Sequence, residues 1–148
     1  MAEWCLANVD RVAGKKVVEL GSGSGLVGLT CWKKCDPASV ILTDFHPKVL
    51  ETLLHNIESN LSKEGALSSL HENGTHFQVG NKLISIESLD WIAYSEGNSD
   101  NYDIEGDIIL ASGKFRVTST VLLNIGSGQF FFKFNFNFVC KMWCTIEI

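Results

Sequence analysis

The chain has 148 residues, of which 45% are hydrophobic and 20% charged, so it has the composition of one globular domain and enough length to bury a core. A net charge of −5 without a basic stripe argues against a general nucleic-acid binder, and no apolar run is long enough to span a membrane. The first residues do not form a secretory signal, so we expect the cytoplasm as the compartment.

The predicted elements alternate between strands and helices. Short runs of β-branched residues predict buried strands, and apolar residues at three- and four-residue steps after Pro47 predict a helix with one apolar face. In chain order we expect a strand over 16–20, a helix over 26–34, a strand over 40–43, a helix from Pro47 to Leu61, a polar loop over 62–76, and strands over 83–86 and 107–111.

This alternation predicts an open α/β sheet with parallel strands and right-handed crossovers, covered by helices on both faces. Such sheets bind ligands at the carboxyl ends of their strands. The segment that follows the first predicted strand is rich in glycine, and it therefore contains the candidate site.

Two motifs overlap in that segment. From Gly23 to Gly28 the spacing is G-x-G-x-x-G, a dinucleotide fingerprint, and Asp44 follows at the distance expected of its acidic residue. From Glu19 the longer spacing is E-x-G-x-G-x-G, with glycines at Gly21, Gly23 and Gly25, which is the motif of class I methyltransferases.

The charge of Glu19 separates these alternatives. A carboxylate at the strand end would repel the pyrophosphate of a dinucleotide, whereas it would attract the ammonium and sulfonium of S-adenosylmethionine. Asp44 closes the second strand, where a carboxylate can accept both hydroxyls of a ribose; capping of the following helix is the alternative for this residue. His46 is interpreted as a surface or capping residue.

A longer stretch of sequence resembles the eukaryotic protein-lysine methyltransferases of the seven-β-strand class. The likeness covers about residues 1–112 and is greatest to members that methylate elongation factor 2, which implies a protein substrate, S-adenosylmethionine as cofactor, and a Rossmann-like class I methyltransferase fold. The residues that carry it are Ala2-Glu3-Trp4, Val18-Glu19-Leu20-Gly21-Ser22-Gly23, Gly25-Leu26, Gly28-Leu29, Cys35, Pro37, Asp44, His46, Val49-Leu50-Glu51, Asn56, Leu89-Asp90-Trp91 and Ile108-Ile109-Leu110-Ala111-Ser112.

The resemblance implies a cofactor site residue by residue. The glycine loop would pass along the methionine and ribose, Asp44 would bind the ribose hydroxyls, Asp90 would approach the adenine amino group, and Ala111 would line the cleft. Trp91 would lie beside the base, with a core tryptophan as the alternative. The candidate cofactor-binding residues are Glu19, Gly21, Ser22, Gly23, Gly25, Asp44, Asp90, Trp91 and Ala111.

The sequence also departs from this family. The family continues after the fourth strand with an aspartate that faces the substrate lysine, but here Ser112 is followed by Gly113-Lys114, so no catalytic residue can be named. A tryptophan that the family carries upstream of the first helix is missing as well. We therefore expect a methyltransferase truncated at both ends, with impaired activity.

The composition changes at the same place. Residues 1–112 contain two of the nine phenylalanines and residues 113–148 the other seven. We divide the chain into a cofactor-binding half over 1–112 and an atypical tail over 113–148, and we hypothesise that the tail is translated intron. The alternating phenylalanines over 130–138 would fit a strand with one aromatic face.

Five cysteines are an odd number, which fits free thiols better than a set of disulfides. Cys31 and Cys35 are four residues apart, as are Cys140 and Cys144, and neither pair has the closer spacing of a zinc knuckle. We expect no metal. Two alternative functions stay open from the sequence: an NAD-binding oxidoreductase, and a non-catalytic fragment that binds the cofactor.

Overall fold

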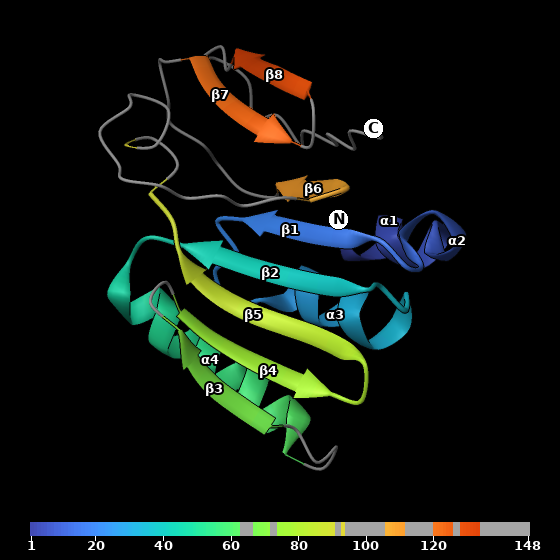
Figure 1. Ribbon diagram of the computed structural model, residues 1–148, viewed down its shortest axis with the longest axis vertical. Coiled ribbons are helices and arrows are strands. Elements are labelled where there is room, and N and C mark those ends of the chain that lie inside the picture. The colour runs from blue at the N-terminus through green and yellow to red at the C-terminus, as the bar shows by residue number, and fades with distance from the viewer. Residues whose placement is uncertain are drawn as a thin grey trace.

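The fold is an open sheet with helices packed against it (Figure 1). The structure, a computed structural model, describes residues 1–62, 67–71, 74–90, 93, 106–111, 120–125 and 128–133. Within these residues the helices are α1 (Ala2–Ala7), α2 (Val9–Val12), α3 (Leu26–Lys34) and α4 (Pro47–Leu61). None of the helices in this part of the chain has the length and apolarity needed to cross a membrane.

The main sheet joins strands in the order β3-β4-β5-β2-β1-β6. Its strands are β1 (Lys16–Leu20), β2 (Ser39–Asp44), β3 (Leu67–His71), β4 (Gly74–Val79), β5 (Lys82–Ser88) and β6 (Ile108–Ala111). β5, β2, β1 and β6 are parallel neighbours. The predicted parallel α/β sheet is therefore confirmed, and each predicted strand overlaps an observed one.

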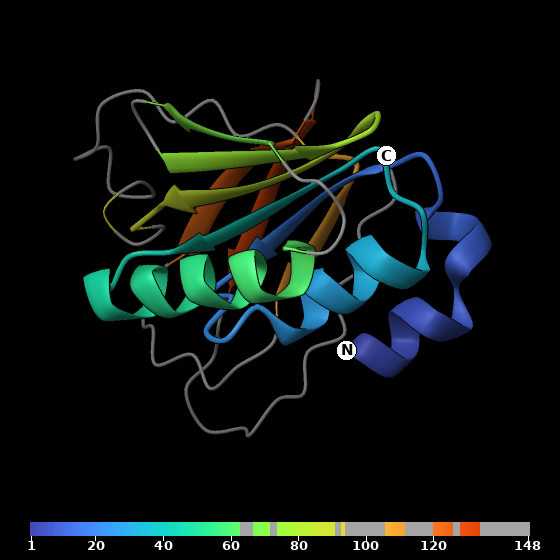
Figure 2. The same ribbon diagram turned by 90° about the horizontal axis from the view of Figure 1, so that it is seen from below.

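Helices α3 and α4 lie on the same face of this sheet (Figure 2). The chain runs from β1 through α3 to β2 and from β2 through α4 to the edge strand β3, which lies farther along in the same direction, so right-handed crossovers place both helices on one side. From β3 it returns through β4 to β5, beside β2. The connection from β5 to β6 returns in the opposite direction, and the same rule would send it over the other face. Of that connection, residues 91–92 and 94–105 lie outside the described part of the chain.

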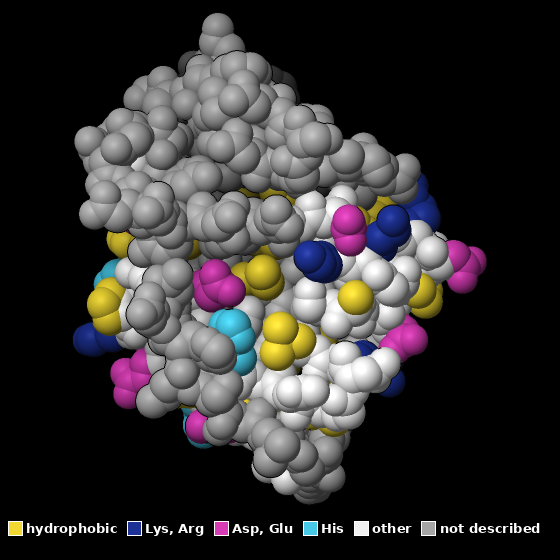
Figure 3. Space-filling model, viewed as in Figure 1, with side chains coloured by type: hydrophobic (Ala, Val, Ile, Leu, Met, Phe, Trp, Pro, Cys, Tyr) yellow, Lys and Arg dark blue, Asp and Glu magenta, His cyan; other side chains and the backbone are white. Residues whose placement is uncertain are grey.

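The core fills the space between the sheet and these helices. On α4, Leu53, Ile57 and Leu61 recur every fourth residue and are buried, as the apolar spacing after Pro47 predicts. They pack in one cluster with the strand residues that point to the same side, such as Leu42. Figure 3 shows the opposite face of the sheet, where hydrophobic side chains lie among polar and acidic ones.

The prediction of a loop over 62–76 was wrong. Much of that segment belongs to a hairpin, because β3 pairs antiparallel with β4 and β4 pairs antiparallel with β5. The alternation from Thr75 to Val79 buries Phe77 in the core, and Gly80, with a φ of 61°, starts the turn into β5. The parallel sheet thus ends in an antiparallel extension.

A separate two-stranded sheet lies in the C-terminal part of the chain. Strand β7 (Thr120–Ile125) pairs antiparallel with β8 (Gly128–Lys133). β8 contains the first residues of the alternating phenylalanine stretch, whose remainder lies outside the described residues. The proposed boundary at residue 112 stays a prediction.

Candidate functional site

The glycine loop joins the carboxyl end of β1 to the start of α3. Gly21, Gly23 and Gly25 have φ values of 62°, 55° and 76°, in the left-handed region that favours glycine. Gly25 is the residue from which α3 begins. Three alternate left-handed residues therefore turn the chain sharply from strand to helix, as the motif predicts.

Two glycines are needed for close packing below the loop. A Cβ atom on Gly28 would clash with Cδ2 of Leu42, and one on Gly25 would lie 2.8 Å from Cδ2 of Leu53. A Cβ atom on Gly23 would meet no atom within 4 Å. The loop is therefore tightly packed at its helix end and open at Gly23.

Hydrogen bonds fasten the loop to β2 and α4. The Ser22 amide donates to the Thr43 carbonyl (2.8 Å), and the Thr43 amide donates to Oγ of Ser22 (3.1 Å). Both hydroxyls also donate to the Glu19 carbonyl. Nδ2 of Asn56, on α4, donates to the Ser24 carbonyl (2.8 Å). These contacts hold the loop in one conformation, which is what a preformed ligand site needs.

Glu19 is buried under the loop, with 1% of its surface exposed. Its Oε2 atom accepts a hydrogen bond of 2.9 Å from the Gly28 amide, in the first turn of α3. Burial raises the pKa of this carboxyl to about 7, although the hydrogen bond from the Gly28 amide favours the charged form. Glu19 therefore anchors α3 to β1, and its attraction of a cationic ligand stays a prediction.

Asp44 lies at the end of β2 and reaches the loop. Its Oδ2 atom accepts a hydrogen bond of 3.3 Å from the Gly23 amide, and its Oδ1 atom accepts from the amides of Phe45 (2.9 Å) and His46 (3.2 Å). The N-cap of α4 is His46, which makes no side-chain capping bond. Asp44 is thus not the helix cap, and it orders its own turn beside Gly23.

The ends of β5 and β6 complete this edge of the sheet. The Leu89 amide donates to the Asp44 carbonyl (3.0 Å), and the exposed Asp90 follows, its Oδ1 atom accepting from the Ala93 amide (3.1 Å). Ala111, at the end of β6, is the register partner of Leu20 at the end of β1. The structure therefore brings the described candidate residues to one edge, whereas Trp91 lies outside the described residues.

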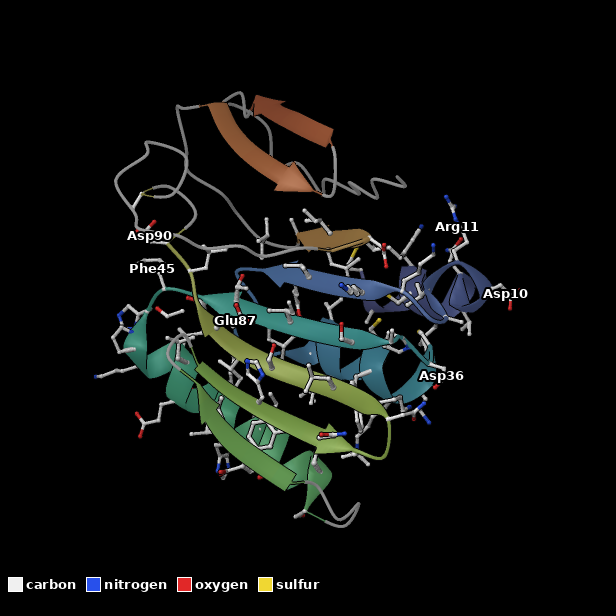
Figure 4. All side chains as sticks on the ribbon, viewed as in Figure 1. Asp10, Arg11, Asp36, Phe45, Glu87 and Asp90 are labelled. Carbon is white, nitrogen blue, oxygen red and sulfur yellow. The ribbon has the colours of Figure 1, made fainter. Side chains whose placement is uncertain are left out.

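Phe45 is a residue that the sequence interpretation missed. Its side chain is 58% exposed directly after Asp44, and Figure 4 shows it at the same edge as Asp90. An exposed aromatic ring at this edge, next in sequence to Asp44, offers a flat apolar face to a base. Its position after the acidic residue that ends β2 was the available signal.

The fold and the glycine loop can be compared with those of solved structures. The chain is similar to the structure of Trm1 from Pyrococcus horikoshii with S-adenosyl-L-methionine, at a TM-score of 0.50 and 20% identity, covering 64% of this chain and 24% of that one. With a parallel sheet and a glycine loop at its carboxyl edge, the fold is the Rossmann-like fold of S-adenosylmethionine-dependent methyltransferases.

The sequence narrows that class. A family model described as lysine methyltransferase matches residues 3–114, and the chain belongs to this family. It is 32% identical over 129 residues to the protein-lysine N-methyltransferase EEF2KMT of Bos taurus, covering 85% of this chain and 37% of that protein. Over 68 residues it is 37% identical to a calmodulin-lysine N-methyltransferase of Arabidopsis thaliana, covering 46% of this chain and 22% of that protein.

The chain spans about a third of the length of the EEF2KMT proteins it matches: 37% of the Bos taurus protein, 31% of the Mus musculus protein and 26% of the Homo sapiens protein. The family uses S-adenosylmethionine as methyl donor, so the predicted family and cofactor are confirmed at that level. Membership also argues against the oxidoreductase alternative.

Proposed function

We propose that this chain is the cofactor-binding half of a cytoplasmic protein-lysine N-methyltransferase whose substrate is elongation factor 2. The bond between Asp44 and Gly23 carries the proposal, because it holds a carboxylate beside an open position of the glycine loop. The substrate follows from similarity to proteins named EEF2KMT.

The cofactor would lie along the carboxyl edge of the sheet. Asp44 has two oxygens with several lone pairs, and three backbone amides orient them, so it can still accept bonds from ribose hydroxyls. The methionine part would pass along Gly21 and Ser22, whose hydroxyl bonds inward to the Glu19 carbonyl. Phe45 and Asp90 would flank the adenine, with Trp91 beside it.

The chemistry of the family needs little from acid or base groups. When bound, S-adenosylmethionine would supply the methyl group that a neutral lysine amine of the substrate protein accepts. Rate comes mostly from holding the two in contact and from desolvating the amine. Gly113 and Lys114 stand where the family has an aspartate facing the lysine. We therefore expect this chain to bind the cofactor but to transfer methyl groups only poorly.

Calorimetry with S-adenosylmethionine tests the site. Gly23→Arg would direct a long side chain from the open position into the proposed cleft and abolish the binding heat. Gly80→Arg is the matched control, because Gly80 has a similar φ of 61° and a Cβ atom there would also meet no atom within 4 Å, but it lies in the turn at the other end of β5. Equal heats for the two variants would contradict the site.

A second assay separates binding from catalysis. Purified elongation factor 2 is incubated with the chain and methyl-labelled S-adenosylmethionine, and incorporation is counted against that by Gly23→Arg. We expect binding without sustained incorporation. Multiple turnovers on elongation factor 2 would contradict the proposal of impaired activity and support the assignment of this protein as the substrate. Steady methylation of another protein in preference to elongation factor 2 would contradict that assignment.

A further inference from the structure

Buried polar side chains gather where the glycine loop leaves β1. Of the four buried polar or charged side chains in the described part of the chain, three belong to Glu19, Ser22 and Thr43, with 1%, 7% and 0% of their surface exposed. The fourth, Ser85, lies in β5. Burying a polar group costs free energy unless it is hydrogen-bonded, so three at one turn need an explanation beyond packing.

Ser22 and Thr43 form a hydroxyl clamp (Ser22, Thr43) between the loop and β2. The Ser22 amide donates to the Thr43 carbonyl (2.8 Å), and the Thr43 amide donates to Oγ of Ser22 (3.1 Å). Oγ1 of Thr43 and Oγ of Ser22 both donate to the Glu19 carbonyl, over 2.8 Å and 3.1 Å. The last register pair of β1 and β2 joins Leu20 to Thr43, so the clamp continues the connection where the strand pairing ends.

The clamp lies directly beside the two groups that carry the proposed cofactor site. Ser22 precedes Gly23 and Thr43 precedes Asp44 in the chain, and the Gly23 amide lies 3.3 Å from Oδ2 of Asp44. That distance is longer than the usual range of about 2.7–3.2 Å, so this bond alone holds the loop only weakly. Oδ1 of Asp44 accepts from the two amides that follow it, which fix the carboxylate to its own turn and not to the loop. The spacing of the two groups therefore depends on the clamp.

We propose that Thr43 is a positioning residue: through the hydroxyl clamp it sets the spacing between the Gly23 amide and the Asp44 carboxylate, and so the affinity for S-adenosylmethionine. This inference rests on the proposed function, in which the Asp44 carboxylate accepts bonds from the ribose hydroxyls. A binding group has to be held within about 0.5 Å of its productive position, and a buried hydroxyl with its bonds made holds the backbone rigidly. Thr43 acts from below the site, because none of its own surface is exposed.

Amide hydrogen exchange of the cofactor-free chain, followed by nuclear magnetic resonance, tests the positioning directly. Thr43→Val keeps the shape of the side chain and removes the hydroxyl that bonds to the Glu19 carbonyl. We expect the Ser22 and Gly23 amides to exchange about 10-fold faster than in the wild type, relative to the amides between β1 and β2, because the loop opens more often. Thr43→Ser keeps a hydroxyl and should restore the slow exchange.

Ser85→Ala is the matched control for the loss of a buried hydroxyl. Ser85 has 1% of its surface exposed, and its Oγ donates to Oε1 of Glu87 (3.3 Å) in the same strand. Its replacement should therefore leave the exchange of the Ser22 and Gly23 amides at the wild-type rate. Unchanged exchange of these two amides in Thr43→Val, or the same acceleration in Ser85→Ala, would overturn the proposal.

Calorimetry carries the test to the cofactor. Thr43→Val should raise the dissociation constant of S-adenosylmethionine about 10-fold, whereas Thr43→Ser should stay within about threefold of the wild type. Phe77→Leu is the control for lost stability, because Phe77 is buried in β4, which β5 and β2 separate from β1; it should keep the wild-type affinity.

Wild-type affinity in Thr43→Val, or an equal loss in Phe77→Leu, would overturn the link between the clamp and the cofactor. A wild-type chain that binds no S-adenosylmethionine would contradict the proposed function itself. The amide exchange would still decide, without the cofactor, whether Thr43 positions the loop.

Discussion

Replacing Glu19 by Gln tests the role of the buried carboxyl most sharply. The folded-state pKa of Glu19 is about 7, above its ordinary value of 4.5, so the folded chain holds a proton that the unfolded chain releases. The proton on Glu19 therefore makes its full contribution to the free energy of unfolding below the ordinary pKa, and this contribution is lost as the pH rises through 7. Glutamine keeps the shape and an oxygen for the Gly28 amide, and it does not titrate.

The magnitude follows from the shift. One pKa unit corresponds to about 1.4 kcal/mol, so Glu19 alone should lower the free energy of unfolding by about 2.5 kcal/mol between roughly pH 5 and pH 8. Urea denaturation at both pH values gives the change in the free energy of unfolding with pH for the wild type and for Glu19→Gln. Subtracting the second change from the first isolates Glu19, because the other titrating groups contribute equally to both. Equal pH dependence in the two proteins would refute the buried, proton-binding carboxyl.

Three further substitutions test the packing, each measured by urea denaturation. Gly28→Ala should cost about 2 kcal/mol or more, because its methyl group would meet Leu42; unchanged stability would show that the contact relaxes freely. Leu53→Ala should cost about 2–5 kcal/mol, since it leaves a cavity under the sheet, and a loss below about 1 kcal/mol would place Leu53 outside the core. Asn56→Ala should cost about 1 kcal/mol by freeing the Ser24 carbonyl, and no loss would make that bond dispensable.

Local patterns were enough to predict the centre of the fold. Continuous β-branched runs predict β1 and β2, and they fit only buried strands. The apolar residues of α4 recur at three- and four-residue steps, which fit only a helix. The hairpin was missed because polar residues and glycines make up most of the segment before Phe77. The alternation to Val79 and the Gly80-Asn81 turn were the signals that favoured strands.

The sequence predicted the residue types of the site more completely than it predicted what their side chains contact. The motif predicts a glycine turn and two acidic residues, and these are present. It does not show that Glu19 points under α3. Strand alternation puts Glu19 on the same side as Val17, which lies in the core, and the glycine at position 28 leaves room for its carboxylate. The bond from Gly23 to Asp44 joins residues 21 apart and needed the three-dimensional fold.

Measurement of the dissociation constants of S-adenosylmethionine and NADH on the same protein preparation tests the cofactor assignment directly. We predict saturable binding of S-adenosylmethionine, with NADH weaker by about 100-fold or more, equivalent to about 2.7 kcal/mol. Asp44→Asn should weaken the first and leave the second unchanged. Tighter binding of NADH would contradict the assignment of this edge of the sheet to a methyl donor.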